Sequence, residues 1–263
     1  ELTMSIQTLF SSPLRVVNVG IESFKEACVQ AGAEAVQVDW RPPVDVAPDA
    51  ESILAKRQAR IEKANQKVLD IIQAGTPKLV GLDIARNVIP GMTDNTILHA
   101  GPPITWDRMC GPMRGGIMAG LVYEGRASTI EEAEALAASG KIKYAPCHEH
   151  GAVGPMAGII TPSMPVMIIH NEKFGNRAFC TLNEGLGKVL RYGAFGAEVT
   201  QRLKWMENTL YPVLKAALAH TGPIDLKNMI AQGVQMGDEV HNRNKASTSL
   251  LIREIASSIV KTS

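Results

Sequence analysis

Short apolar runs and one amphipathic stretch follow each other at the start of the chain. Residues 14–20 (LRVVNVG) and 35–40 (AVQVDW) are short and rich in β-branched side chains, which predicts two strands. Residues 22–31 between them mix polar and apolar positions and stop before Gly32, which predicts a helix. This strand–helix–strand order indicates a parallel unit.

A long helix and a third strand extend this unit. Apolar residues recur near every seventh position from Leu54 to Ile72, which predicts a helix over residues 50–74. Its basic side chains are typical of a solvated helix surface, and a docking face for a partner is the alternative. The apolar run 77–84 predicts a third buried strand, so we expect a Rossmann-like parallel α/β domain over residues 1–95.

Glycine and proline are frequent in the middle of the chain. Ser128 and Glu131 have the spacing of a capping box, which predicts a helix over residues 129–139. Two apolar runs on either side of NEKFGN (171–176) predict a hairpin. We expect a mixed α+β domain over residues 96–195.

The pattern changes to helical periodicity near residue 196. Apolar positions three and four apart predict helices over residues 199–219, 226–240 and 246–260. A helical segment is therefore expected over residues 196–263. The predicted fold class is α/β, with a Rossmann-like domain, an α+β domain and a helical segment in this order.

Composition excludes several classes of protein. Lysine and arginine total 27 against 26 acidic residues, a net charge of +1, so we expect no surface for nucleic acid or an anionic membrane. The hydrophobic fraction of 45% and the charged fraction of 20% are typical of globular proteins. Four cysteines without a CxxC pair, no signal-peptide pattern and no long apolar run predict a cytoplasmic protein.

Two segments share the tripeptide Gly-Pro-Met, RMCGPMRGG (108–116) and HGAVGPMAG (150–158). Proline favours the first turn of a helix, so each segment predicts a helix start whose free N–H groups bind phosphate or carboxylate. Arg108 and Arg114 flank the first segment and would add guanidinium donors. The alternative is close packing at the glycines, with arginines paired to surface carboxylates. The candidate anion-binding residues here are Arg108, Gly111, Met113, Gly115, Gly154 and Met156.

The densest polar cluster is Cys-His-Glu-His at 147–150. If this segment is extended, His148 and His150 point to one face and could bind a divalent metal together or transfer a proton. The other histidines that could complete a metal site, among them His99, lie at no diagnostic spacing. We expect no cofactor. A metal at His148 and His150 is one alternative, and histidines bonded to backbone are another.

The segment NEGLGK (183–188) resembles a phosphate loop superficially. Val189 stands where a Walker A motif has Ser or Thr, and Leu182 replaces its leading glycine, so that motif is excluded. Asn183 and Lys188 could still contact an anion, and solvent-exposed charges are the alternative.

Several longer strings together resemble the YlbE/AllG family, and the resemblance covers essentially the whole chain. They are LHAGPPITWDRMCGPMRGG (98–116), YEG (123–125), PCHEHGAVGPMAGIITPSMPV (146–166), NEGLGKVLRYG (183–193), RLKWM (202–206) and HNRNKASTSLLIRE (241–254). Members of this family continue well past the position that matches Ser263, so we expect this chain to lack their C-terminal portion.

The resemblance implies a subunit of oxamate carbamoyltransferase, an enzyme of allantoin and purine catabolism. That enzyme converts oxalurate and phosphate to oxamate and carbamoyl phosphate, and its implied partners are FdrA/AllF-like and AllH-like subunits in an oligomer. The ligands are small anions, which agrees with the Gly-Pro-Met segments.

Catalytic roles follow from this reaction and are our own assignment. Arg108, Arg114 and Lys188 would neutralise the phosphate and the oxyanion. His148 or His150 would move the proton on the oxamate nitrogen. Two alternatives are an assembly subunit without catalytic residues and a metal-dependent amide hydrolase that uses the 147–150 cluster.

Overall fold

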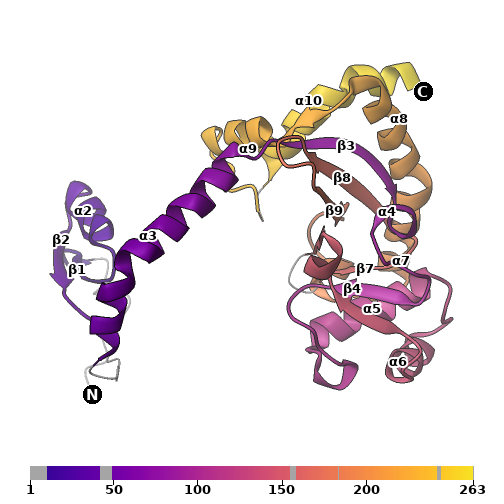
Figure 1. The fold of residues 1–263 in the computed structure, drawn as a ribbon, viewed down its shortest axis with the longest axis horizontal. Helices are drawn as coiled ribbons and strands as arrows, with labels where there is room; N and C mark the ends of the chain where they lie inside the picture. The colour runs from indigo at the N-terminus through magenta and orange to yellow at the C-terminus, as the bar shows by residue number, and fades with distance from the viewer. Residues whose placement is uncertain (1–10, 42–48, 155–157, 183, 242–243, 263) are drawn as a thin grey trace. The chain divides into compact units, whose positions relative to one another are not determined.

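A computed structural model describes residues 11–41, 49–154, 158–182, 184–241 and 244–262. The chain forms two compact units, residues 1–67 and residues 68–263, and each is described by itself. The described residues form a mixed α/β structure with three separate sheets (Figure 1). Among the described residues, no helix combines the length and the apolar character that crossing a bilayer requires.

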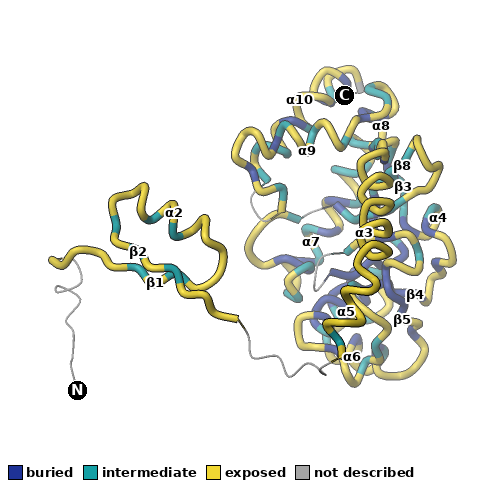
Figure 2. Tube along the Cα trace, turned by 60° about the vertical axis from the view of Figure 1, so that its left-hand side comes forward, coloured by how far each residue is buried: buried dark blue, intermediate teal, exposed yellow. Residues whose placement is uncertain are grey.

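The first unit contains the strand–helix–strand order that its sequence predicts. Strands β1 (Arg15–Val19) and β2 (Glu34–Val38) pair in parallel, and α2 (Glu22–Gln30) connects them. The long helix α3 (Ala50–Ala74) follows, with bounds equal to the predicted ones. Neither helix has a buried residue, as the yellow and teal tube of Figure 2 shows. Two strands and one short helix do not confirm a Rossmann-like domain.

The third strand of the predicted parallel sheet lies elsewhere, so that expectation is corrected. Strand β3 (Pro77–Ile84) pairs antiparallel with β8 (Pro165–Asn171) and with β10 (Ile224–Asp225). Its side chains Leu79 and Leu82 are buried in a cluster with the C-terminal helices. An apolar run predicts a buried strand but carries no information about its partners, which here come from far along the chain.

Sheet order in the second unit places the predicted hairpin at its centre. The five-stranded sheet has the order β10-β3-β8-β9-β6. Strands β8 and β9 (Arg177–Thr181) form the antiparallel hairpin around the NEKFGN turn, which confirms that prediction. Strand β6 (Ala152–Val153) pairs in parallel with β9 at the sheet edge.

A three-stranded sheet positions the residues of interest. Its central strand β4 (Thr96–His99) pairs in parallel with β5 (Lys143–Pro146) and antiparallel with β7 (Ile159–Ile160). The connection from β4 to β5 runs through α5 (Gly111–Tyr123) and α6 (Ile130–Ala138), which makes a second strand–helix–strand unit. Parallel strands place their carboxyl ends at one edge of a sheet, and the following helices begin there.

The C-terminal part is helical, as its periodicity predicts. Helix α7 (Ala197–Trp205) continues through a π-helical turn, η4 (Met206–Leu210), into α8 (Tyr211–Thr221), and Pro212 stands in the first turn of α8. Two further helices, α9 (Leu226–Gln235) and α10 (Lys245–Thr262), follow, and the apolar faces of α8, α9 and α10 cover β3.

Helix α6 begins one residue later than the predicted capping box. Thr129 is its N-cap, and the Thr129 hydroxyl accepts a hydrogen bond from the Glu132 N–H at 3.2 Å. The Glu132 carboxylate in turn accepts from the Ser128 N–H at 2.8 Å. Thr129 is therefore the residue that caps this helix, and the Glu132 carboxylate binds the N–H of Ser128, the residue before the cap, where the sequence predicted a capping box of Ser128 and Glu131.

This cap gives a stability prediction. Thr129→Ala removes the acceptor for the Glu132 N–H and should lower the free energy of unfolding by about 1 kcal/mol. Ser128→Ala is the matched control, because Ser128 contributes only its backbone N–H, and it should change stability by less than about 0.5 kcal/mol. Urea unfolding of both variants measures the difference, and equal effects would contradict the assigned cap.

Candidate functional site

The first Gly-Pro-Met segment starts a helix, as predicted. The turn η1 (Trp106–Arg108) leads into α5, whose N-cap is Cys110 and whose first turn contains Pro112. The Cys110 side chain makes no capping hydrogen bond, so the first-turn N–H groups of Gly111 and Met113 remain available. The positive end of the helix dipole adds to these donors and favours an anion.

A second predicted segment packs directly on this helix start. The turn η3 (Leu190–Tyr192) ends at Gly193, which has a left-handed backbone with φ of 82°. A Cβ added at Gly193 would overlap the backbone of Pro112, and one added at Gly115 would overlap the Gly193 carbonyl oxygen. The structure therefore brings the RMCGPMRGG and NEGLGKVLRYG segments together, and only glycine fits at their contact.

The two arginines of the first segment differ in how they are held. Arg114 donates from Nη2 to the Asp107 carbonyl oxygen at 2.7 Å, and its guanidinium lies 5.2 Å from the centre of the Trp106 ring. Its Nε is buried without a hydrogen-bond partner in the described structure. Arg108 is exposed, and no described hydrogen bond or ion pair holds its side chain. Arg114 is thus preorganised, whereas Arg108 is free to reorient.

The segment before Gly193 is held by a half-buried carboxylate. Glu184 accepts a hydrogen bond from the Leu190 N–H at 2.9 Å. Burial raises the pKa of Glu184, although the guanidinium groups of Arg191 and Arg202 oppose this shift. Arg191 donates to the Gly185 carbonyl oxygen at 2.8 Å, and its Nε is another buried atom without a described partner. These contacts fold the segment back on itself.

Lys188 lies on the same folded segment. Its side chain is exposed, while its carbonyl oxygen accepts a hydrogen bond from Arg202 at 2.7 Å. The side chain of Met113, another residue of the predicted set, is buried in the core, so its backbone N–H is its candidate contact with an anion. Asn183 lies outside the described residues.

The second Gly-Pro-Met segment lies largely outside the described residues. Met156 and its two neighbours belong to the part of the chain that is not described, so the second helix start stays a prediction. The described chain resumes at Gly158 and enters strand β7 (Ile159–Ile160). Gly154 lies next to Cys147, because a Cβ built at Gly154 comes within 3.4 Å of the Cys147 Sγ.

The Cys-His-Glu-His cluster is a 3₁₀ turn, η2 (Cys147–His150), and not an extended segment. Residues two apart do not share a face of such a turn, so the expected common face of His148 and His150 is wrong. His148 is exposed, and His150 Nδ1 donates to the Pro90 carbonyl oxygen at 2.6 Å. The turn follows Pro146, whose fixed φ of −64° ends strand β5.

Neither histidine is joined to the α5 site by a described contact. No hydrogen bond or ion pair within the described ranges connects His148 or His150 with Arg114. Burial raises the pKa of the Cys147 thiol to about 11, so this cysteine stays protonated near neutral pH. The described residues contain no group of three His, Cys, Asp or Glu side chains placed to hold a metal ion.

Known proteins are similar to most of this chain. Residues 142–263 match the family model described as "Oxamate carbamoyltransferase subunit AllG". The chain is 43% identical over 203 residues to the oxamate carbamoyltransferase subunit AllG of Escherichia coli K12, covering 76% of this chain and 48% of that protein. The chain belongs to the AllG family.

Two further similar proteins extend the comparison. YahG of E. coli K12, an uncharacterized protein, is 46% identical over 97% of this chain and 55% of its own length. The crystal structure of a conserved protein of unknown function from Enterococcus faecalis V583 has a TM-score of 0.74 and 48% identity, over 77% of this chain and 48% of that one. The chain thus spans about half the length of the curated relatives it matches.

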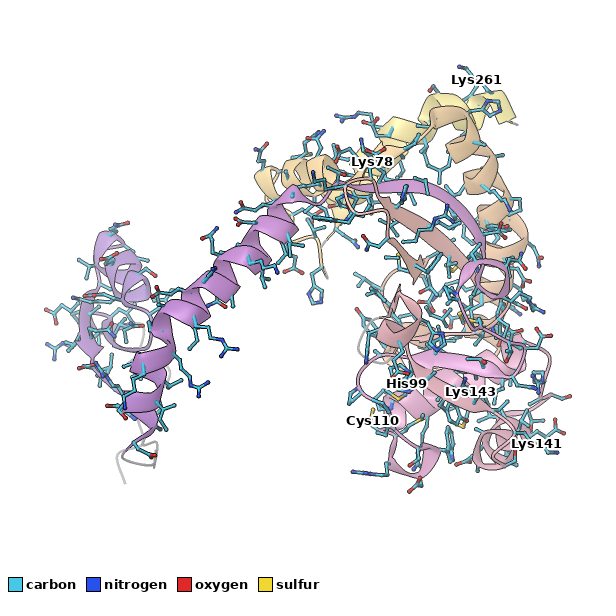
Figure 3. The ribbon with its side chains drawn as sticks, in the orientation of Figure 1. Lys78, His99, Cys110, Lys141, Lys143 and Lys261 are labelled. Carbon is cyan, nitrogen blue, oxygen red and sulfur yellow. The ribbon has the colours of Figure 1, made fainter. Side chains whose placement is uncertain are left out.

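The sequence pointed to His99 only as a possible further metal ligand and did not place it among the candidate anion-binding or catalytic residues. His99, at the carboxyl end of β4, is fully buried, and its Nε2 has no hydrogen-bond partner in the described structure. In the view of Figure 3, His99 and Cys110, the N-cap of α5, lie on the same side of the unit. A histidine that ends the apolar run TILH was the available signal, because polar residues at strand ends often face ligands.

The glycine contact gives a second stability prediction. Gly115→Ala places a Cβ against the Gly193 carbonyl oxygen and should lower the free energy of unfolding by about 1–3 kcal/mol through overpacking. Gly111→Ala is the matched control in the same helix, because a Cβ there meets no atom within 4 Å. Chemical denaturation compares the two, and equal stabilities would show that the two segments are not in contact.

Glu184 gives a prediction of pH dependence. Because burial raises its pKa in the folded state, the folded protein keeps a proton that the unfolded chain releases from about pH 4.3 upward. The contribution of Glu184 to the free energy of unfolding therefore falls as pH rises from about 4.3 toward the raised pKa of the folded state. Relative to wild type, Glu184→Gln should gain stability as pH rises and then level off.

Urea unfolding between pH 4 and pH 8 checks this trend. Glu149→Gln, which removes an exposed carboxylate, is the matched control for the loss of one negative charge. A stability difference between Glu184→Gln and wild type that stays constant with pH would contradict the buried position of Glu184.

Proposed function

We propose that this chain is a subunit of a carbamoyltransferase that acts on oxamate and related small anions. The observation that carries the proposal is its 43% identity to the oxamate carbamoyltransferase subunit AllG of E. coli. The reaction we assign converts oxalurate and phosphate to oxamate and carbamoyl phosphate, in the direction of allantoin breakdown. All four molecules are small anions.

The α5 site suits such ligands chemically. The free N–H groups of Gly111 and Met113, with the helix dipole, favour a carboxylate or phosphate oxygen. Gly111 lets an anion approach the backbone, because no atom lies within 4 Å of the position that a Cβ would take there. Arg114 is held in place by Trp106 and Asp107, and Arg108 and Lys188 have exposed side chains that could reach a ligand.

The roles we propose follow from the bonds that change. A phosphate oxygen attacks the carbamoyl carbon of oxalurate, a C–O bond forms, and the C–N bond to the oxamate nitrogen breaks. Negative charge grows on the carbonyl oxygen, where Arg114 and the α5 amides would stabilise it. The leaving oxamate nitrogen takes a proton, which His148 or His150 would supply.

Partners are part of this proposal. The E. coli relative is named as a subunit of its enzyme, which supports a multi-subunit complex. We propose FdrA/AllF-like and AllH-like subunits as partners and a cytoplasmic location. The second candidate function is an assembly subunit, with the reacting groups on the partners.

Kinetics of the reconstituted complex separate the two candidates. Arg114→Ala should lower kcat/KM by about 10²–10³-fold with assembly intact, because a preorganised donor to the developing oxyanion is lost. Lys141→Ala, an exposed lysine outside the site, is the matched control and should leave the rate unchanged. Size-exclusion chromatography of both variants confirms assembly. Full activity of an assembled Arg114→Ala complex would favour the assembly role.

A further inference from the structure

His99 is a buried histidine with one ring nitrogen unsatisfied. Its side chain has no solvent contact, and Nε2 has no hydrogen-bond partner in the described structure. Nδ1 lies 2.9 Å from the Ala100 carbonyl oxygen. A carbonyl oxygen only accepts, so Nδ1 carries the proton, and in the uncharged ring Nε2 is left as an acceptor. A buried acceptor without a donor is costly, which calls for an explanation.

The ring lies on the side of the sheet that α5 covers. Side chains alternate along a strand, so His99 points to the same face as Ile97 and away from Leu98. Ile97 is in the core cluster with Met113 and Ile117 of α5, whereas Leu98 is in a different cluster with Cys147. His99 is also the last residue of β4, at the edge where the chain leaves the sheet toward the start of α5.

This edge therefore combines two complementary groups. The first turn of α5 offers N–H donors and a positive dipole end, which suit a carboxylate. His99 offers the unpaired ring nitrogen Nε2 as an acceptor, which suits an N–H group. A small molecule with a carboxylate next to an amide nitrogen satisfies both at once.

We propose that His99 is the residue of this site that recognises the amide nitrogen of oxamate. The ligand –NH₂ donates to His99 Nε2, while its carboxylate accepts from the first-turn N–H groups of α5. This inference rests on the proposed function and adds to it the residue that distinguishes an amide from other small carboxylates. Nε2 has no contact with solvent in this structure, so a ligand can reach it only after a local rearrangement of the surrounding residues. Such a rearrangement favours a small ligand.

Two ligands of equal charge and shape test the assignment. Oxamate carries the amide, and pyruvate has a methyl group in its place. Isothermal titration of the full chain should show about tenfold tighter binding of oxamate, because pyruvate leaves the buried acceptor unpaired. The His99 ring nitrogens, followed by long-range ¹H–¹⁵N spectra, should shift with oxamate and not with pyruvate.

Two substitutions separate recognition from packing. His99→Asn keeps a polar group near the position of Nδ1 and lacks one at Nε2, so the preference for oxamate should disappear. His99→Gln places an amide oxygen near the position of Nε2 and should keep most of the preference. Thermal unfolding of both variants shows whether each is folded.

Different outcomes of these experiments test the inference about His99 and the proposed function. Equal binding of oxamate and pyruvate by the wild type, no binding of either, or an unmoved His99 ring overturns the inference and leaves an ordered water as the partner of Nε2. Activity of the reconstituted complex tests the proposed function separately. An active complex whose preference for oxamate survives in His99→Asn would overturn this inference alone.

Discussion

The site depends on one close contact between two stretches of backbone. Gly193 and the first turn of α5 approach so closely that neither Gly193 nor Gly115 has room for a Cβ. This contact fixes the folded segment that carries Lys188 and Arg191 against the helix start that carries Arg114. Without it, the amides of α5 and the cationic side chains of residues 184–193 would belong to separate surfaces.

Packing behind this contact explains why it is stable. Leu190 of the folded segment is buried in the same cluster as Ile97, Met113 and Ile117, so the core of the second unit extends beneath the site. Within this segment, the Glu184 carboxylate accepts a hydrogen bond from the Leu190 N–H, and Arg191 donates one to the Gly185 carbonyl oxygen. These two backbone groups therefore have hydrogen-bond partners. Burial of apolar side chains thus stabilises the contact between the two segments, and a small set of polar contacts defines the conformation of residues 184–193.

Local patterns predicted local structure well. The strand–helix–strand order of the first unit, helix α3, the β8–β9 hairpin and the start of α5 all follow from turn residues and periodicity. The partners of β3 could not be predicted, because they depend on contacts across more than 80 residues. The 147–150 turn was mistaken for an extended segment because four residues carry too little periodic signal. His99 was named only as a possible metal ligand, since its burial and its unpaired ring nitrogen are properties of the fold.

The central claim is that the start of α5 and the end of β4 form one binding site for a small amide-bearing anion. A crystal structure of the protein with oxamate tests it most directly. The account predicts a carboxylate oxygen about 2.9 Å from the N–H groups of Gly111 or Met113, and the amide nitrogen at hydrogen-bond distance from His99 Nε2. Oxamate bound instead at His148 and His150, with the α5 start empty, would contradict it.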